Sequence, residues 1–212
     1  MAQDGLTVRL DRWAARIDRA VYWLAGHWLA LINGIVGLFV GLAMAAPILM
    51  HVGWAGPARV LYWAYLPTCH QLPERSFFLF GERWVYSVEE LEARGMATGL
   101  MLWQRRWFYG NDLAGYKIAI CERDVAIYGS IVIAGLLYGL VRRWGQPKPL
   151  PVKIYLLFLV PIALDGMTQL VGLRESTWWL RVVTGALFGA ASVWFGYPFV
   201  DRAMDDVRAR AL

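Results

Sequence analysis

The chain has 212 residues, of which 58% are hydrophobic and only 17% are charged, and its mean hydropathy is +0.43. Soluble domains carry about 45–50% apolar and about 25% charged residues, so this composition excludes an ordinary soluble domain and indicates an integral membrane protein. The net charge of +5 does not indicate nucleic-acid binding, because the basic residues cluster at the ends of predicted helices, where anionic headgroups attract them. Membrane lipid is therefore an expected partner, and nucleic acid is not.

Residues 1–28 are predicted to form an amphipathic helix that lies in the membrane interface. Apolar residues recur there at steps of three and four: Leu6, Leu10, Trp13, Ile17, Val21 and Leu24. Four arginines repeat at the same spacing on another face: Arg9, Arg12, Arg16 and Arg19. Two such faces are typical of a helix on a membrane surface. Packing of this helix on the protein's own surface is the alternative.

Four apolar segments are long enough to cross about 30 Å of hydrocarbon, which takes roughly 20 helical residues. They lie near 29–50, 124–141, 153–172 and 178–199. The expected fold class is therefore all-α integral membrane. It consists of the amphipathic helix, a four-helix transmembrane bundle over residues 29–200, and a charged tail over 201–212 that is expected to be solvated, including Asp201.

The segment 51–123, between the first and second spans, is expected to be a long outer loop that contains short helices. Residues 57–66 are bounded by prolines and are too few to cross the membrane, which predicts a half-helix. Farther along, Ser87 and Glu90 have the spacing of a capping box. This spacing predicts one more helix in the stretch 87–107, outside the bilayer.

Basic residues in the short segments predict the orientation of the chain. The N-terminal segment, the 142–153 loop and the tail carry eleven Lys and Arg residues on one side, whereas the 173–181 connection carries two on the other. Positively charged short segments stay in the cytoplasm. Both termini are therefore expected to be cytoplasmic, and the 51–123 segment to lie outside the cytoplasmic membrane.

Three pairs of glycines, each four residues apart, lie on three different spans. They are Gly37 and Gly41, Gly135 and Gly139, and Gly185 and Gly189. Small residues at this spacing allow helix backbones to approach closely. Packing within one bundle is expected, and packing against a partner helix is the alternative.

Four residues with metal-binding side chains lie at the outer side of the predicted bundle. Cys69 and His70 are neighbours in the loop, and Cys121 and Asp124 begin the second span three residues apart, on one helical face. Thiolate, imidazole and carboxylate groups are all zinc ligands, so these four residues form a candidate metal site for which zinc is a possible ion. A disulfide between Cys69 and Cys121 is the alternative, because the loop is expected to face an oxidising compartment.

The third span contains a carboxylate, Asp165, with Thr168 and Gln169 beside it on the same helical face. A charge inside a span costs about 2.5–3.5 kcal/mol on insertion scales, so it is rarely found without a partner. At a rise of 1.5 Å per residue, Asp165 lies roughly 10 Å below the outer end of its span, near the cysteine loop. An ion pair with Arg75 or Arg123 and a functional role are both open. The expected polar network consists of Gln71, Glu74, Arg75, Arg123, Asp165, Thr168, Gln169, Arg174 and Glu175.

Three ordered motifs resemble one membrane protein family. They read Cys-His-Gln-x-Pro-Glu-Arg-Ser-Phe at 69–77, Cys-x-Arg-x-x-x-Ile-Tyr at 121–128, and Asp-Gly-x-Thr-Gln-Leu-x-Gly-Leu-Arg-Glu-Ser-Thr at 165–177. Together they are similar to the bacterial and archaeal family called domain of unknown function 2085, which implies a small polytopic membrane protein. Where the family pattern has Cys-x-Arg-Cys, this chain has Asp124 in place of the second thiol. Cys, His, Cys and Asp then remain as a four-ligand set.

Three functions are compatible with these features. The first is a non-catalytic accessory or assembly subunit of a larger membrane complex, with other membrane protein subunits as partners. The glycine faces and the lack of a complete catalytic set favour it. The second is a metal-dependent or thiol-redox membrane enzyme, although the absence of a Cys-x-x-Cys pair argues against the redox form. The third is a small transporter that uses Asp165.

Overall fold

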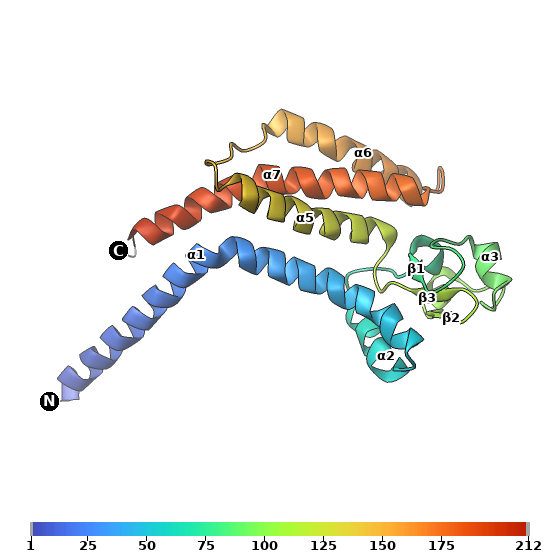
Figure 1. Cartoon of the computed structure of the whole chain (residues 1–212), viewed down its shortest axis with the longest axis horizontal. Coiled ribbons are helices and arrows are strands. Elements are labelled where there is room, and N and C mark those ends of the chain that lie inside the picture. Colours follow the sequence, from blue (N-terminus) through green and yellow to red (C-terminus); the bar gives the residue numbers. More distant parts are fainter. Residues whose placement is uncertain (1, 211–212) are drawn as a thin grey trace.

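The protein is mainly helical, with a small three-stranded sheet between the first two long helices (Figure 1). The computed structural model describes the backbone of residues 2–210 and the side chains of residues 12–210. Four of its helices are long and apolar enough to cross a membrane. These are α1 (Ala2–His51), α5 (Glu122–Val141), α6 (Val152–Leu170) and α7 (Trp178–Arg210).

Helix α1 is a single continuous helix that covers two segments expected as separate elements, 1–28 and 29–50. Its N-terminal part extends away from the other helices (Figure 1). Of the predicted apolar face, Trp13 and Ile17 are 61% and 59% exposed, so this part of the face does not pack on the protein's own surface and is free to contact lipid. Leu6, Arg9 and Leu10 lie outside the described side chains.

Each predicted span lies almost wholly within one long helix, but α7 continues beyond residue 199 to Arg210. The expectation that Asp201 is solvated was wrong, because its side chain is buried. The carboxylate of Asp201 accepts hydrogen bonds from Trp28 Nε1 and from the Tyr138 hydroxyl, each at 3.2 Å, and pairs with Arg142 at 2.9 Å. This cluster joins α1, α5 and α7.

Helix α7 packs closely against α5 because glycines line the contact. A Cβ atom added at Gly185 would lie 2.9 Å from the carbonyl oxygen of Arg123, and one at Gly189 would overlap the carbonyl of Ile127. At distances this short, a hydrogen atom fits on the α-carbon but a methyl group does not. The 185/189 glycine pair is therefore part of the α5–α7 interface within this chain.

The other two glycine pairs lie on the facing helices α1 and α5. The glycines of α1 have more space around them than those at the α5–α7 contact. A Cβ at Gly135 would overlap Asn33, and one at Gly139 would lie 3.1 Å from Leu29. On the α1 side, a Cβ at Gly37 would approach only Val132, at 4.0 Å, and one at Gly41 would meet nothing within 4 Å.

The segment 51–123 contains short helices and three short strands. They are α2 (Ala55–Ala64), the 3₁₀-helix η1 (Pro73–Arg75), β1 (Phe78–Leu79), α3 (Val88–Glu92), α4 (Leu102–Arg105), β2 (Gly110–Asn111) and β3 (Gly115–Lys117). The strands pair antiparallel in the order β1-β3-β2, with Phe78 opposite Lys117 and Asn111 opposite Gly115. The sequence did not predict this sheet, because strands of two or three residues are too short to show alternation.

The helices predicted in this segment are found with altered lengths. Helix α2 is the half-helix expected at 57–66. Helix α3 begins with the predicted capping box, in which Ser87 and Glu90 bond each other's backbone N–H groups. The stretch 87–107 contains two short helices where one was expected, because Gly95, with a φ of +99°, ends α3 and the chain turns before α4 begins.

The α5–α7 contact provides a stability test. We expect Gly189→Ala to lower the free energy of unfolding in detergent micelles by roughly 1–3 kcal/mol, because the new methyl group forces the two backbones apart. Gly196→Ala, on the same helix but with no neighbour within 4 Å of its Cβ position, should be neutral or stabilising by up to about 1 kcal/mol. Equal effects of the two substitutions would contradict this account of the packing.

Candidate functional site

The candidate site is built around the first residues of α5, at the end of the bundle that faces the sheet (Figure 1). Cys121 is the N-cap of this helix, and Glu122, Arg123 and Asp124 form its first turn. Successive residues of an α-helix point about 100° apart, so neighbours in sequence contact different parts of the structure.

Three of the four predicted metal ligands come together. The ligand atoms of Cys69, Cys121 and Asp124 all lie within 4.8 Å of one another, and Cys69 is buried. His70 is outside this group and is exposed, although it lines the same cavity of about 240 Å³. Both cysteines are free thiols in the structure, so the disulfide stays a prediction.

The two thiols share a hydrogen bond that makes them chemically different. The hydrogen bond from Cys121 lowers the pKa of Cys69, and the same bond together with burial raises the pKa of Cys121. The backbone N–H of Cys121 also donates to Cys69 Sγ at 3.2 Å. Cys69 is therefore the thiol that loses its proton first, and a thiolate is the form that binds a metal.

The loop that carries Cys69 is held by a buried lysine that the sequence analysis missed. Lys117 is fully buried, and its Nζ donates to the carbonyl oxygens of Gln71 and Arg106, each at 2.6 Å. The Tyr62 hydroxyl donates in turn to the carbonyl of Lys117 at 2.5 Å. Gln71 adopts a positive φ of 52° and donates from its amide to the Tyr62 carbonyl. These bonds fix the backbone next to Cys69.

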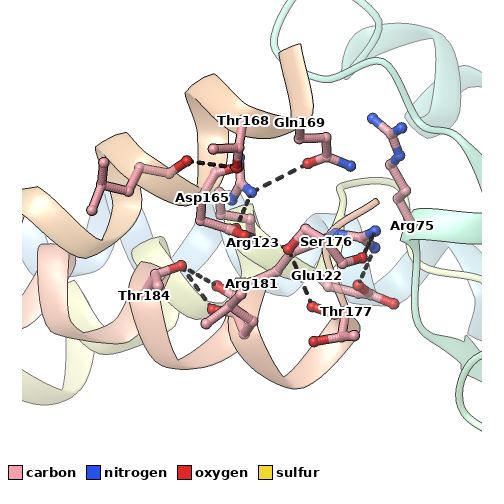
Figure 2. A network of polar contacts seen from close by, with 12 residues as sticks. Arg75, Glu122, Arg123, Asp165, Thr168, Gln169, Ser176, Thr177, Arg181 and Thr184 are labelled. Atoms are coloured by element: carbon pink, nitrogen blue, oxygen red, sulfur yellow. Dashed lines mark hydrogen bonds and ion pairs between the residues drawn. The ribbon is translucent and has the colours of Figure 1, made fainter. Parts of the chain in front are cut away.

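Asp165 is held by three donors, and Figure 2 shows part of this network. Its carboxylate pairs with Arg123 at 2.5 Å and with Arg174 at 2.7 Å, and it accepts a hydrogen bond from the Ser176 hydroxyl at 2.9 Å. Of the two partners that the sequence suggested, Arg123 is present and Arg75 is not. Asp165 thus connects α6 to α5 and to the connection that leads into α7.

A second buried ion pair, between Glu122 and Arg181, connects α5 to α7. The two side chains are 2.8 Å apart and almost fully buried, and Arg181 also donates to the Ser176 carbonyl (Figure 2). The sequence analysis did not single out this pair. Its signal was an acidic residue near the start of one span and a basic residue near the start of another, since such charges are costly unless they pair.

The remaining residues of the predicted polar network lie around this centre. Arg75 pairs with Glu175 at 3.2 Å, and Glu74 pairs with Arg105 at 3.3 Å. The amide of Gln169 lies within hydrogen-bond distance of the guanidinium groups of Arg75 and Arg123. Thr168 bonds only backbone carbonyls of its own helix, so its side chain does not join the charged groups.

The buried ion pair predicts a strong effect of unpaired charge. Glu122→Gln should lower the free energy of unfolding by roughly 3–5 kcal/mol, because it leaves the Arg181 guanidinium buried without its carboxylate. The double variant Glu122→Gln/Arg181→Gln should recover part of this loss. As a control, Glu90→Gln removes the exposed pair with Arg83 and should cost less than about 1 kcal/mol. Chemical unfolding in detergent measures all three, and a double variant that is no more stable than Glu122→Gln would contradict the pairing.

Lys117 predicts a dependence of stability on pH. Burial lowers the pKa of Lys117 to about 7, and the charge of Arg106 lowers it further. The negative charges of Cys69 and Glu74 act in the opposite direction and offset only part of the shift. Between about pH 7 and 10.5 the unfolded chain therefore binds the proton that the folded chain lacks, and stability rises with pH. Between these two pH values, the free energy of unfolding of the wild type should rise by on the order of 3–5 kcal/mol more than that of Lys117→Met.

The measurement is the free energy of unfolding at several pH values for the two proteins, with the exposed Lys148→Met as a control. A wild-type profile parallel to that of Lys117→Met would contradict the prediction. Tyr109 lies beside the amine, with its ring centre 5.6 Å from Nζ, and is unchanged in all three proteins.

Comparison with known proteins identifies the family. A family model described as "Predicted membrane protein (DUF2085)" matches residues 108–195, which include Cys121, Arg123 and Asp165. The uncharacterized protein MJ1492 of Methanocaldococcus jannaschii is 31% identical over 159 residues, which cover 72% of this chain and 80% of that protein. No solved structure matches the chain. The chain therefore belongs to the DUF2085 family of predicted membrane proteins.

Proposed function

We propose that this protein is a metal-dependent membrane enzyme whose ion, of the zinc class, is held by Cys69, Cys121 and Asp124. The observation that carries the proposal is the meeting of two thiols and a carboxylate, from two distant segments, within 4.8 Å of one another. Soft thiolates with one carboxylate select zinc over magnesium or calcium, which prefer oxygen ligands alone.

The number of ligands supports an open site. Structural zinc sites are closed by four protein ligands, whereas catalytic sites have three and leave one position for water or substrate. Here the three ligands face a cavity of about 240 Å³ that is also lined by Arg75, Arg123 and Gln169. An ion in this position would lower the pKa of a bound water and polarise a bound oxygen.

The chain's own residues would orient an anionic substrate in this cavity. Arg123 and Arg181 both line it, and the Nε atom of each is buried without a hydrogen-bond partner. Their terminal nitrogens bond Asp165 and Glu122, so the two guanidinium groups are held in fixed positions. Fixed donors of this kind stabilise negative charge without reorganising during a reaction.

We also propose that the site lies on the extracytoplasmic side. The two ends of the chain lie at the same end of the molecule, and the sheet and the site lie at the other (Figure 1). Eleven basic residues belong to short segments at the end with the termini, which the positive-inside rule assigns to the cytoplasm. Four helices that are long and apolar enough to cross the bilayer are consistent with this arrangement.

An accessory subunit of a larger membrane complex is the second candidate. It is supported by a groove of about 780 Å³ between α1 and α5, lined mainly by small and apolar side chains such as Gly34, Val132 and Leu136. A helix of another membrane subunit would fit such a surface. In this case the metal site would be structural, and His70 would supply its fourth ligand.

Metal analysis of the purified protein tests the proposal. We expect about one zinc-class ion per chain in the wild type, loss of at least 90% of it in Cys69→Ser and Cys121→Ser, and a weaker affinity, by roughly 10- to 100-fold, in Asp124→Asn. His70→Ala should retain the ion with unchanged affinity. Glu175→Gln, an exposed change at the same end of the bundle, is the matched control.

Each outcome separates the alternatives. A wild-type protein that carries no metal after purification without chelators, and whose two thiols are oxidised to a disulfide, would overturn the metal site. An ion that is lost in His70→Ala would indicate a closed, four-ligand site and support the accessory subunit instead of the enzyme.

A further inference from the structure

A second cavity, of about 560 Å³, lies beside the cysteine site, between α4, the C-terminal end of α6 and the loop that carries His70. One side of it is cationic, with Arg75, Arg106 and Arg123. The other side is apolar, with Leu102, Trp103 and Leu170. No Asp or Glu is among the described residues that line it, so its charge is strongly positive.

The arginines keep donors that no protein group uses. Arg106 Nε and Arg123 Nε are buried and have no hydrogen-bond partner. Arg75 and Arg123 are fixed by carboxylates that lie outside the lining, Glu175 and Asp165. A buried donor without a partner is costly, and an arginine fork matches the oxygens of a phosphate group. The cationic side is therefore shaped for an anion.

The apolar side lies where lipid is expected. Leu170 is the last residue of α6, one of the helices that could cross a membrane, and it is 86% exposed. Leu102 and Trp103 on α4 are 57% and 61% exposed. Tryptophan is enriched at the level of the headgroups, and leucine is stable against acyl chains. A free phosphate would make no use of these three side chains.

We propose that this cavity binds the phosphate headgroup of an anionic membrane lipid. The phosphate lies against Arg75, Arg106 and Arg123, and the start of the acyl chains lies along Leu102, Trp103 and Leu170. The proposal does not depend on the metal site, because none of the three metal ligands lines this cavity.

Lipid binding to the full-length protein in detergent tests the proposal, with native mass spectrometry as the readout. The probes are phosphatidic acid, phosphatidylcholine, glycerol 3-phosphate and inorganic phosphate. Phosphatidic acid should bind at least about tenfold more tightly than phosphatidylcholine and than either lipid-free phosphate. Arg106→Gln should weaken phosphatidic acid binding about tenfold. It leaves the bond from Lys117 intact, because that bond uses the carbonyl of residue 106.

The matched control is Arg59→Gln, which removes an exposed arginine on α2 outside the cavity and should leave the affinity unchanged. Leu170→Glu places a negative charge at the exposed apolar side and should also weaken binding, without a buried change that could prevent folding. Equal affinity for glycerol 3-phosphate and phosphatidic acid, or equal affinity in Arg106→Gln and Arg59→Gln, would overturn the proposal.

The same measurement separates this inference from the proposed function. Cys69→Ser and Asp124→Asn, which are expected to lose or weaken the metal, should bind phosphatidic acid as the wild type does. Arg106→Gln should keep its metal. A metal-free wild type that still binds phosphatidic acid would overturn the metal site and leave the lipid site standing.

Discussion

The first turn of α5 is the part of the structure on which the rest depends. Its four consecutive residues each contact a different part of the protein. Cys121 bonds the cysteine loop, Glu122 pairs with α7, Arg123 pairs with α6, and Asp124 belongs to the candidate metal group. They can do so because successive side chains leave a helix in different directions. The carboxylates of the two ion pairs are buried, where an isolated charge is costly, so each charge fixes the position of its partner. The arrangement also leaves the Nε of Arg123 free for the cavities, because its terminal nitrogen is already bound to Asp165.

Two arguments from the sequence predicted parts of the fold and the site: the length of the apolar segments and the energetic cost of a charge inside a span. Apolar segments of about 20 residues indicate the four long helices. A carboxylate inside a span needs a partner, which led to Arg123 as one candidate for Asp165. The positions of Cys121 and Asp124 on one helical face follow from their spacing of three residues. These arguments use only local geometry and the low polarity of the membrane.

The parts that depend on how the elements meet could not be predicted. Glu122 and Arg181 can pair because Gly185 and Gly189 allow α5 and α7 to pack closely. The rotation of one helix relative to the other cannot be deduced from the sequence of either helix. His70 lies outside the metal group, and the next residue, Gln71, has a positive φ although it is not a glycine, which the sequence does not indicate. Asp201 looked solvated beside other charged residues, yet Trp28 and Tyr138 cover it.

The order of residues along the chain also determines when the two buried ion pairs can form during synthesis. The ribosome makes the first turn of α5 before Asp165 and Arg181, which belong to the last two long helices. Glu122 and Arg123 therefore emerge as charges without partners, and a charge in this state is stable only in water or among headgroups. The two ion pairs are completed when α6 and α7 have been inserted and their charges reach α5. The formation of these ion pairs is a late step of biogenesis, and a chain truncated before Arg181 leaves Glu122 without its partner.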